Sequence, residues 1–105
     1  MEPTRIEILE QTLQSTPDNT FARYALALEL SRAGQPERAW QQFEHLLAQH
    51  PDYAATYLQA GMVLAKEGRK EEARAIFTKG IEVNRKQGNL HAQSELEAAL
   101  EELEE

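Results

Sequence analysis

Few residues in this chain of 105 have the types and spacing that catalysis or metal binding requires. The three histidines are His45, His50 and His91. The first two are separated by five positions, whereas two ligands on one helix face need a spacing of four. Because cysteine is absent, disulfides, thiolate catalysis and zinc–thiolate sites are excluded. No strand–turn–helix pattern presents a serine nucleophile. We therefore expect a protein that is not an enzyme, with no catalytic residues, no metal site, no cofactor and solvent-exposed histidines.

The charge balance excludes two further classes of partner. Eleven Lys and Arg are scattered among 18 Asp and Glu, for a net charge of −7. Phosphate backbones and anionic membrane surfaces require clustered basic residues, so we expect neither nucleic acid nor a membrane as partner. The acidic run 95–105 could attract a basic partner. We interpret it as a solubilising face on a terminal helix.

The N-terminus lacks the basic and then apolar run of a secretory signal, and no apolar stretch approaches the length of a membrane span. We expect one cytoplasmic domain covering residues 1–105. A domain taken from a longer protein would have the same sequence features, so that alternative stays open.

The chain repeats at a spacing of 34 residues, and this repeat predicts the elements that position every side chain. Gly34 corresponds to Gly68, and Pro17 corresponds to Pro51. Ala39 and Phe43 in the first copy correspond to Ala73 and Phe77 in the second. A period of this length is typical of helix–turn–helix units that bury their apolar faces by stacking.

Apolar spacing, caps and breakers predict six helices and no strand. Thr4 and Glu7 form a capping-box pattern before the first helix, and Pro36 suits the first turn of the third. Gly34 and Gly68 are expected to end the second and fourth helices in a left-handed conformation. The predicted helices cover 4–15, 18–33, 36–49, 52–66, 70–85 and 90–103.

These repeats resemble the tetratricopeptide repeat (TPR). The second copy contains Tyr57-x-x-Ala60-Gly61-x-x-Leu64, followed by Gly68 and Ala73-x-x-x-Phe77. The first copy departs from the family pattern at Arg23, which replaces an aromatic residue, and Arg85 replaces the closing proline of the second. The resemblance implies an all-α, right-handed superhelix of antiparallel helix pairs. Its expected parts are an N-terminal half-unit helix (4–15), repeat one (18–51), repeat two (52–85) and a C-terminal capping helix (89–104).

The resemblance also implies where a partner binds, because such arrays bind ligands mainly through a concave side formed by the first helix of each unit. The partner-binding residues expected on this side are Phe21, Tyr24, Leu28, Arg32, Leu58, Met62 and Lys66. The last helix would add Asn89, Ala92 and Leu96 if it continued the 34-residue register. It could instead fold into the groove and cover it, and the sequence does not decide between these arrangements.

We expect the protein to be a non-enzymatic adaptor or scaffold that binds a protein or peptide of unknown identity in this apolar groove. The alternative is a self-associating homodimer, formed through the groove or by exchange of the last helix across Gln87–Asn89. A clamp for the acidic tails of heat-shock chaperones is not supported. The matching positions hold Tyr24, Leu28 and Gln59 instead of Lys, Asn and Arg.

Overall fold

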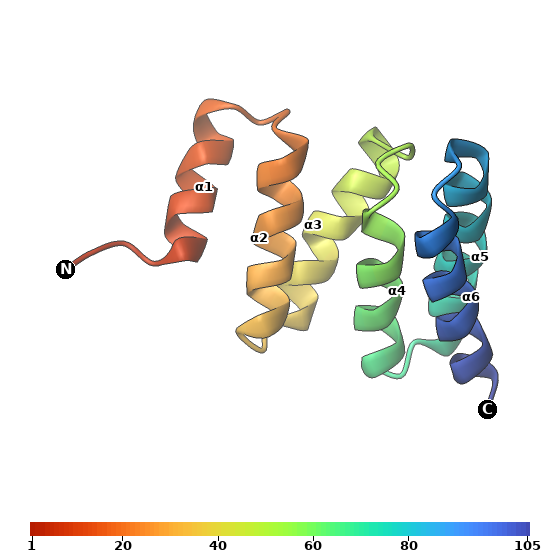
Figure 1. Cartoon of the computed structure of the whole chain (residues 1–105). Coiled ribbons are helices and arrows are strands. Elements are labelled where there is room, and N and C mark those ends of the chain that lie inside the picture. The colour runs from red at the N-terminus through yellow and green to blue at the C-terminus, as the bar shows by residue number, and fades with distance from the viewer. The chain divides into compact units, whose positions relative to one another are not determined.

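A computed structural model describes all residues, 1–105, and contains six helices and no strand (Figure 1). The predicted all-α fold is therefore confirmed. The chain divides into two compact units, Met1–His50 (unit 1) and Pro51–Glu105 (unit 2). Unit 1 contains α1 (Arg5–Ser15), α2 (Thr20–Arg32) and α3 (Pro36–Gln49); unit 2 contains α4 (Thr56–Lys66), α5 (Lys70–Gln87) and α6 (Leu90–Glu104).

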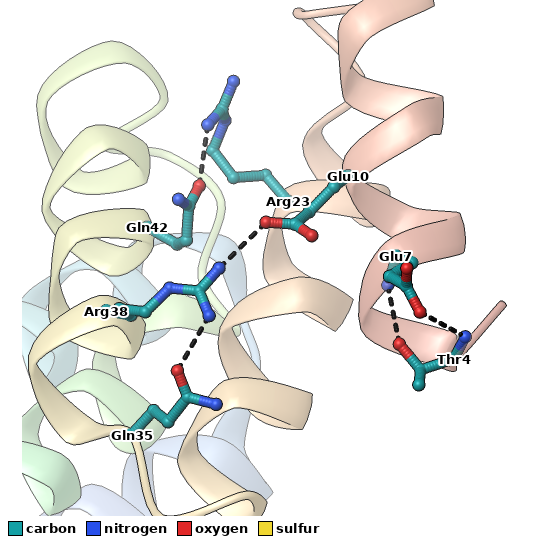
Figure 2. A network of polar contacts seen from close by, with 7 residues as sticks. All are labelled: Thr4, Glu7, Glu10, Arg23, Gln35, Arg38 and Gln42. Carbon is teal, nitrogen blue, oxygen red and sulfur yellow. Dashed lines mark hydrogen bonds and ion pairs between the residues drawn. The ribbon is translucent and has the colours of Figure 1, made fainter.

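Several helix ends follow the sequence signals. The Thr4 hydroxyl accepts a hydrogen bond from the Glu7 N–H at 3.1 Å, and the Glu7 carboxylate accepts one from the Thr4 N–H at 2.9 Å (Figure 2). This reciprocal pair is the predicted capping box. Gly34 and Gly68 have φ values of 75° and 79°, which favour glycine because it lacks a Cβ. Both predicted glycine caps are confirmed.

Two predicted helix starts were too early. Helix α2 begins at Thr20 and not at Asp18, because the Asn19 side chain accepts a hydrogen bond from the Ala22 N–H at 2.9 Å and so caps the helix there. Helix α4 begins at Thr56 and not at Asp52. The preceding residues form turns, and the Thr56 N–H donates to the Tyr53 carbonyl at 3.2 Å.

In unit 1, α2 packs against both α1 and α3. Phe43 of α3 is fully buried and meets the Tyr24 ring edge-to-face, with 6.4 Å between ring centroids. Salt bridges add to the attachment of α1: Arg38 binds Glu10 at 2.8 Å, and Arg5 binds Glu29 at 3.0 Å. Figure 2 shows the Arg38 contact beside Arg23, whose guanidinium donates to Gln42 at 2.7 Å. The same guanidinium also donates to the Pro17 carbonyl at 3.0 Å.

In unit 2, α5 packs against both α4 and α6, and two glycines permit close contact. A Cβ on Gly61 would lie 2.3 Å from an atom of the Phe77 ring. A Cβ on Gly80 would lie 2.4 Å from the Tyr57 Cβ and 3.2 Å from a Leu96 methyl group. The Tyr57 hydroxyl donates to the Pro51 carbonyl at 2.5 Å. Large side chains on one helix therefore occupy the space that glycine leaves on another.

The junction between α5 and α6 is held by amide side chains. Helix α5 extends to Gln87, two residues beyond the predicted end, and Gly88 ends it with a φ of 76°. The buried Asn84 amide donates to the Gly80 carbonyl at 2.9 Å and accepts from Asn89 at 3.3 Å. It also lies 3.5 Å from the Ala54 carbonyl, in the turn before α4. The Gln87 amide donates to the Asp52 carbonyl at 2.8 Å.

Candidate functional site

The candidate residues of unit 1 lie at helical spacing on α2. Phe21 is 70% exposed, an unusual position for a large aromatic side chain. Tyr24 and Leu28 are half-buried, and Arg32 is exposed and pairs with Glu29 at 3.1 Å. Because Tyr24 is also packed against Phe43, its ring is held in one place. This face therefore combines one free aromatic ring, a fixed ring and an ion pair.

The candidate residues of unit 2 line a groove with a volume of about 730 Å³. Leu58, Met62, Ala65 and Lys66 of α4 form one wall, and Phe77 of α5 also contributes to the lining. The opposite wall belongs to α6. Its lining residues are Glu95, Ala98, Ala99, Glu102 and Leu103. The groove falls within the size range of typical ligand pockets, and most of its lining residues are apolar. The structure thus brings Leu58, Met62 and Lys66 together in the lining of one groove.

Helix α6 forms one side of this groove. It packs mainly on α5 and makes fewer contacts with α4, so that Met62 remains 49% exposed. Helix α6 does not continue the 34-residue register, which the sequence had left open. Counterparts of Leu58, Met62 and Lys66 would be residues 92, 96 and 100, whereas residues 95, 99 and 103 line the groove.

The conditional candidates Asn89, Ala92 and Leu96 do not line the groove. Leu96 is 1% exposed because it fills the space beside Gly80, and Asn89 bonds to Asn84. Burying the Leu96 side chain rotates the next residues of α6 toward α4. The α6 residues that line the groove could have been predicted from their spacing, which places them on one helix face. They are Glu95, Ala98, Ala99, Glu102 and Leu103.

Charges are arranged unevenly around the groove. Two carboxylates, Glu95 and Glu102, are on the α6 side, and the Lys66 ammonium is on the α4 side. Neither Glu102 nor Lys66 takes part in an ion pair, and Glu95 lies 3.6 Å from the exposed His91 imidazole. The Arg74 guanidinium of α5 instead binds Glu104 at 2.5 Å and also Glu71, and its hydrogen bond lowers the pKa of Glu104.

No group of three His, Asp or Glu residues comes together in a way that could hold a metal ion. His45 and His91 are exposed and His50 is half-buried. Desolvation is the main cause of the lowered pKa of His45. None of the helices combines the length and apolar character needed to cross a membrane.

Comparison with known proteins agrees with this geometry. The family model described as tetratricopeptide repeat matches residues 30–100. A tetratricopeptide repeat domain protein from Salinibacter ruber is 36% identical, with a TM-score of 0.79. The alignment with its solution structure covers 84% of our chain and 89% of the Salinibacter chain. The alignment with its crystal structure covers 82% of our chain and 97% of the Salinibacter chain.

A solution structure of a Bordetella parapertussis protein matches the fold with a TM-score of 0.84, at 24% identity, covering 97% of this chain and 89% of that one. No curated protein matches. The family model and the Salinibacter structures agree with the helix pairing, the glycine caps and the small residues at the helix crossings. This chain therefore belongs to the tetratricopeptide repeat family.

Proposed function

We propose that this protein is a non-catalytic adaptor that binds a peptide or a helix of a partner protein in the groove between α4 and α6 of unit 2, with the exposed face of α2 in unit 1 as a separate candidate surface. TPR domains generally mediate protein–protein interactions, which agrees with this proposal. The observation that carries it is the groove of about 730 Å³ in unit 2, whose wall contains Leu58 and Met62.

The chemistry of these surfaces suits apolar anchors on a partner. Met62 has a flexible side chain that can adapt its shape to a ligand, and half of it is available for contact. Phe21 in unit 1 offers a larger exposed ring. Aromatic and flexible apolar side chains of this kind are enriched in the central parts of protein interfaces. A partner that buries them gains hydrophobic free energy without reorganising either core.

The test is a peptide-display selection on the full chain, followed by binding measurements with purified peptides. We expect Met62→Glu to weaken peptides that bind the groove of unit 2 at least tenfold, and Leu28→Glu to weaken peptides that bind the α2 face of unit 1. Ile8→Glu is the matched control, because Ile8 is 49% exposed, like Met62, but lies on α1 outside both surfaces. Circular dichroism verifies that each variant is folded.

Two outcomes would contradict the proposal. In the first, Met62→Glu and Leu28→Glu leave binding of all selected peptides unchanged. In the second, Ile8→Glu weakens binding as much as Met62→Glu does, which would mean that the peptides recognise exposed apolar residues in general.

Self-association through the same surfaces is the second candidate. Exchange of α6 between two chains would have to break the bonds from Gln87 to Asp52 and from Asn89 to Asn84, so these contacts weigh against it. Pairing through Met62 and Phe21 needs no such change. Light scattering over a dilution series, with Met62→Glu as comparison, distinguishes a dimer from a monomer that binds a foreign peptide.

A further inference from the structure

The α6 side of the groove carries a charge pattern that the adaptor proposal leaves unused. Glu95 and Glu102 are seven residues apart, which corresponds to two helical turns or about 10 Å along the axis. Both lie on the same face of α6 as the small residues Ala98 and Ala99. The α6 wall of the groove therefore has a short apolar stretch, Ala98 and Ala99, between two carboxylates.

These carboxylates are not neutralised by the protein's own bases. Arg74 is engaged by Glu104 and Glu71, and Glu102 has no ion pair. His91 lies near Glu95 but is 91% exposed and 3.6 Å away. Helix α6 contains no Lys or Arg at all. Lys66 on the opposite wall is the one cation in the lining, against two carboxylates, so the groove favours a cationic ligand.

The shape of the groove selects a helix. Leu58, Met62, Ala65 and Lys66 form one stripe on α4, and Glu95, Ala99, Glu102 and Leu103 form a similar stripe on α6. Both stripes extend over about two turns, or roughly 12 Å. In Figure 1, α4 and α6 run in the same direction beside α5. The two stripes therefore run parallel along opposite sides of the groove. A third helix fits such a channel by placing apolar anchors at i, i+3, i+4 and i+7.

We propose that the groove of unit 2 recognises a basic amphipathic helix, whose apolar face contacts Leu58 and Met62 and whose Lys or Arg residues, two turns apart, pair with Glu95 and Glu102. This inference rests on the proposed function, and it adds the charge and conformation of the partner. The apolar contacts supply most of the affinity, and the two ion pairs supply selectivity and orientation.

The experiment uses the full chain and two capped helical peptides of about 16 residues. Both have leucines at i, i+3, i+4 and i+7; one carries two lysines seven residues apart beside this face, and the other carries glutamates there. Fluorescence anisotropy measures Kd, and amide chemical-shift changes show where each peptide binds. We expect the lysine peptide to bind at least about tenfold more tightly, with shifts on α4 and α6.

Paired charge variants locate the effect. Glu95→Gln with Glu102→Gln should reduce the preference for the lysine peptide to about threefold or less. Glu97→Gln with Glu101→Gln is the matched control, since it removes the same charge from exposed positions of α6 outside the groove, and should leave the preference unchanged. All four glutamates are exposed, so these variants should fold.

Each other outcome overturns a defined part of the argument. If both peptides bind at Met62 with equal affinity, the adaptor proposal stands and the preference for a basic helix is wrong. If both double variants weaken the lysine peptide equally, the attraction comes from the overall negative charge and Glu95 and Glu102 are not specific. If neither peptide shifts α4 or α6, the basic-helix inference fails, and only the Met62→Glu test with display-selected peptides decides the adaptor proposal.

Discussion

Units 1 and 2 use the same 34-residue pattern but place different side chains at one structural position. In unit 2, the Tyr57 hydroxyl binds the Pro51 carbonyl. In unit 1, the Arg23 guanidinium binds the carbonyl of Pro17, the residue that corresponds to Pro51. An arginine and a tyrosine thus make equivalent hydrogen bonds, each joining a helix to the carbonyl of the proline in the turn before it; we call this bond the proline tie. What the repeat preserves here is a donor that reaches the proline carbonyl, whereas the residue type is free to vary.

The units also differ in the residues at their helix crossings. Ala27 and Leu46 of unit 1 correspond to Gly61 and Gly80 of unit 2, where an added Cβ would lie within 2.4 Å of a neighbouring side chain. Phe77 fills the space at Gly61, and Tyr57 and Leu96 fill the space at Gly80. Close packing fixes the total volume of the side chains that face one another at a helix crossing. The two units fill this volume with different combinations of large and small residues.

The largest expected effect comes from Gly80→Ala. The new methyl group would lie 2.4 Å from the Tyr57 Cβ, which is fixed to the α4 backbone, so α4 and α5 would have to separate. We expect a loss of about 3 kcal/mol in the free energy of unfolding, measured in urea by circular dichroism. Lys79→Ala, at the exposed neighbouring position, should change it by no more than about 0.5 kcal/mol. A small effect of Gly80→Ala would show that the space beside Tyr57 and Leu96 can accommodate a methyl group after all.

Gly61→Ala should be less destabilising, because the atoms it meets belong to the Phe77 ring, which can move more easily than a backbone-fixed Cβ. We expect a loss of about 1–2 kcal/mol, after a partial gain from the better helix propensity of alanine. The reverse change in unit 1, Ala27→Gly, should cost about 1 kcal/mol through propensity and lost packing.

The double variant Gly61→Ala with Phe77→Leu tests the same argument by urea unfolding. The two changes should be less harmful together than the sum of the single effects, because the smaller side chain leaves room for the methyl group. Simple additivity would contradict the proposed exchange of volume between the two positions.

Removing the tie to the proline carbonyl should have a smaller effect in both units. Tyr57→Phe deletes the donor in unit 2, and we expect it to lower the free energy of unfolding by about 1 kcal/mol. Arg23→Met should lower it by about 1–2 kcal/mol, because it also removes the hydrogen bond to Gln42. In unit 1, Arg23→Tyr should restore part of the loss if the two donors are interchangeable. If it is no more stable than Arg23→Met, the equivalence of the two ties is wrong.

The two ties should also differ in their response to pH. Burial is the main cause of the raised pKa of the Tyr57 hydroxyl, with a contribution from the Asp52 carboxylate. The folded state therefore holds this proton more tightly than the unfolded state. The resulting stabilisation is complete below the ordinary tyrosine pKa of about 10 and declines as the pH rises above it. Urea unfolding between pH 9 and 11 should show a weaker decline in Tyr57→Phe than in the parent protein.

The smallest effect is expected from the surface ion pairs that attach the outer helices. Arg74→Gln breaks the contact to Glu104 on α6, and Arg38→Gln breaks the contact to Glu10 on α1. We expect amide exchange in α6 or α1 to become faster by at most about fivefold, because exposed pairs contribute little. Since the pKa of Glu104 is lowered, its contribution is present above the ordinary glutamate pKa and is lost as the pH falls through the folded value.

Local signals in the sequence were sufficient for much of the fold. Thr4 with Glu7, and the glycines at 34 and 68, act through bonds to their own neighbours, so that their spacing alone predicted the helix ends correctly. The start of α4 was missed because it depends on a turn around Tyr53 and not on a capping side chain. The equivalence of Arg23 and Tyr57 was also missed, since it requires knowing where the proline carbonyls point.

The candidate surface was predictable only on the first helices of the repeats. Leu58, Met62 and Lys66 were identified because they follow the repeat period. Glu95, Ala99 and Glu102 were missed because α6 is rotated by the burial of Leu96, and that burial depends on the space beside Gly80 in another helix. The absence of a side chain at Gly80 of α5 thus decides which face of α6 meets the groove.

The buried Asn84 amide has a consequence for how unit 2 opens. Its donors and acceptor are satisfied only when the end of α5, the turn before α4 and the start of α6 are all in place. Detaching α6 alone would leave a buried polar group without its partner, which is unfavourable. Whereas a simple stack of helices can fray from its last member inward, the last helix of this protein is coupled to the first helix of its own unit. We therefore expect α6 to detach less readily than the last helix of a stack that lacks such a link.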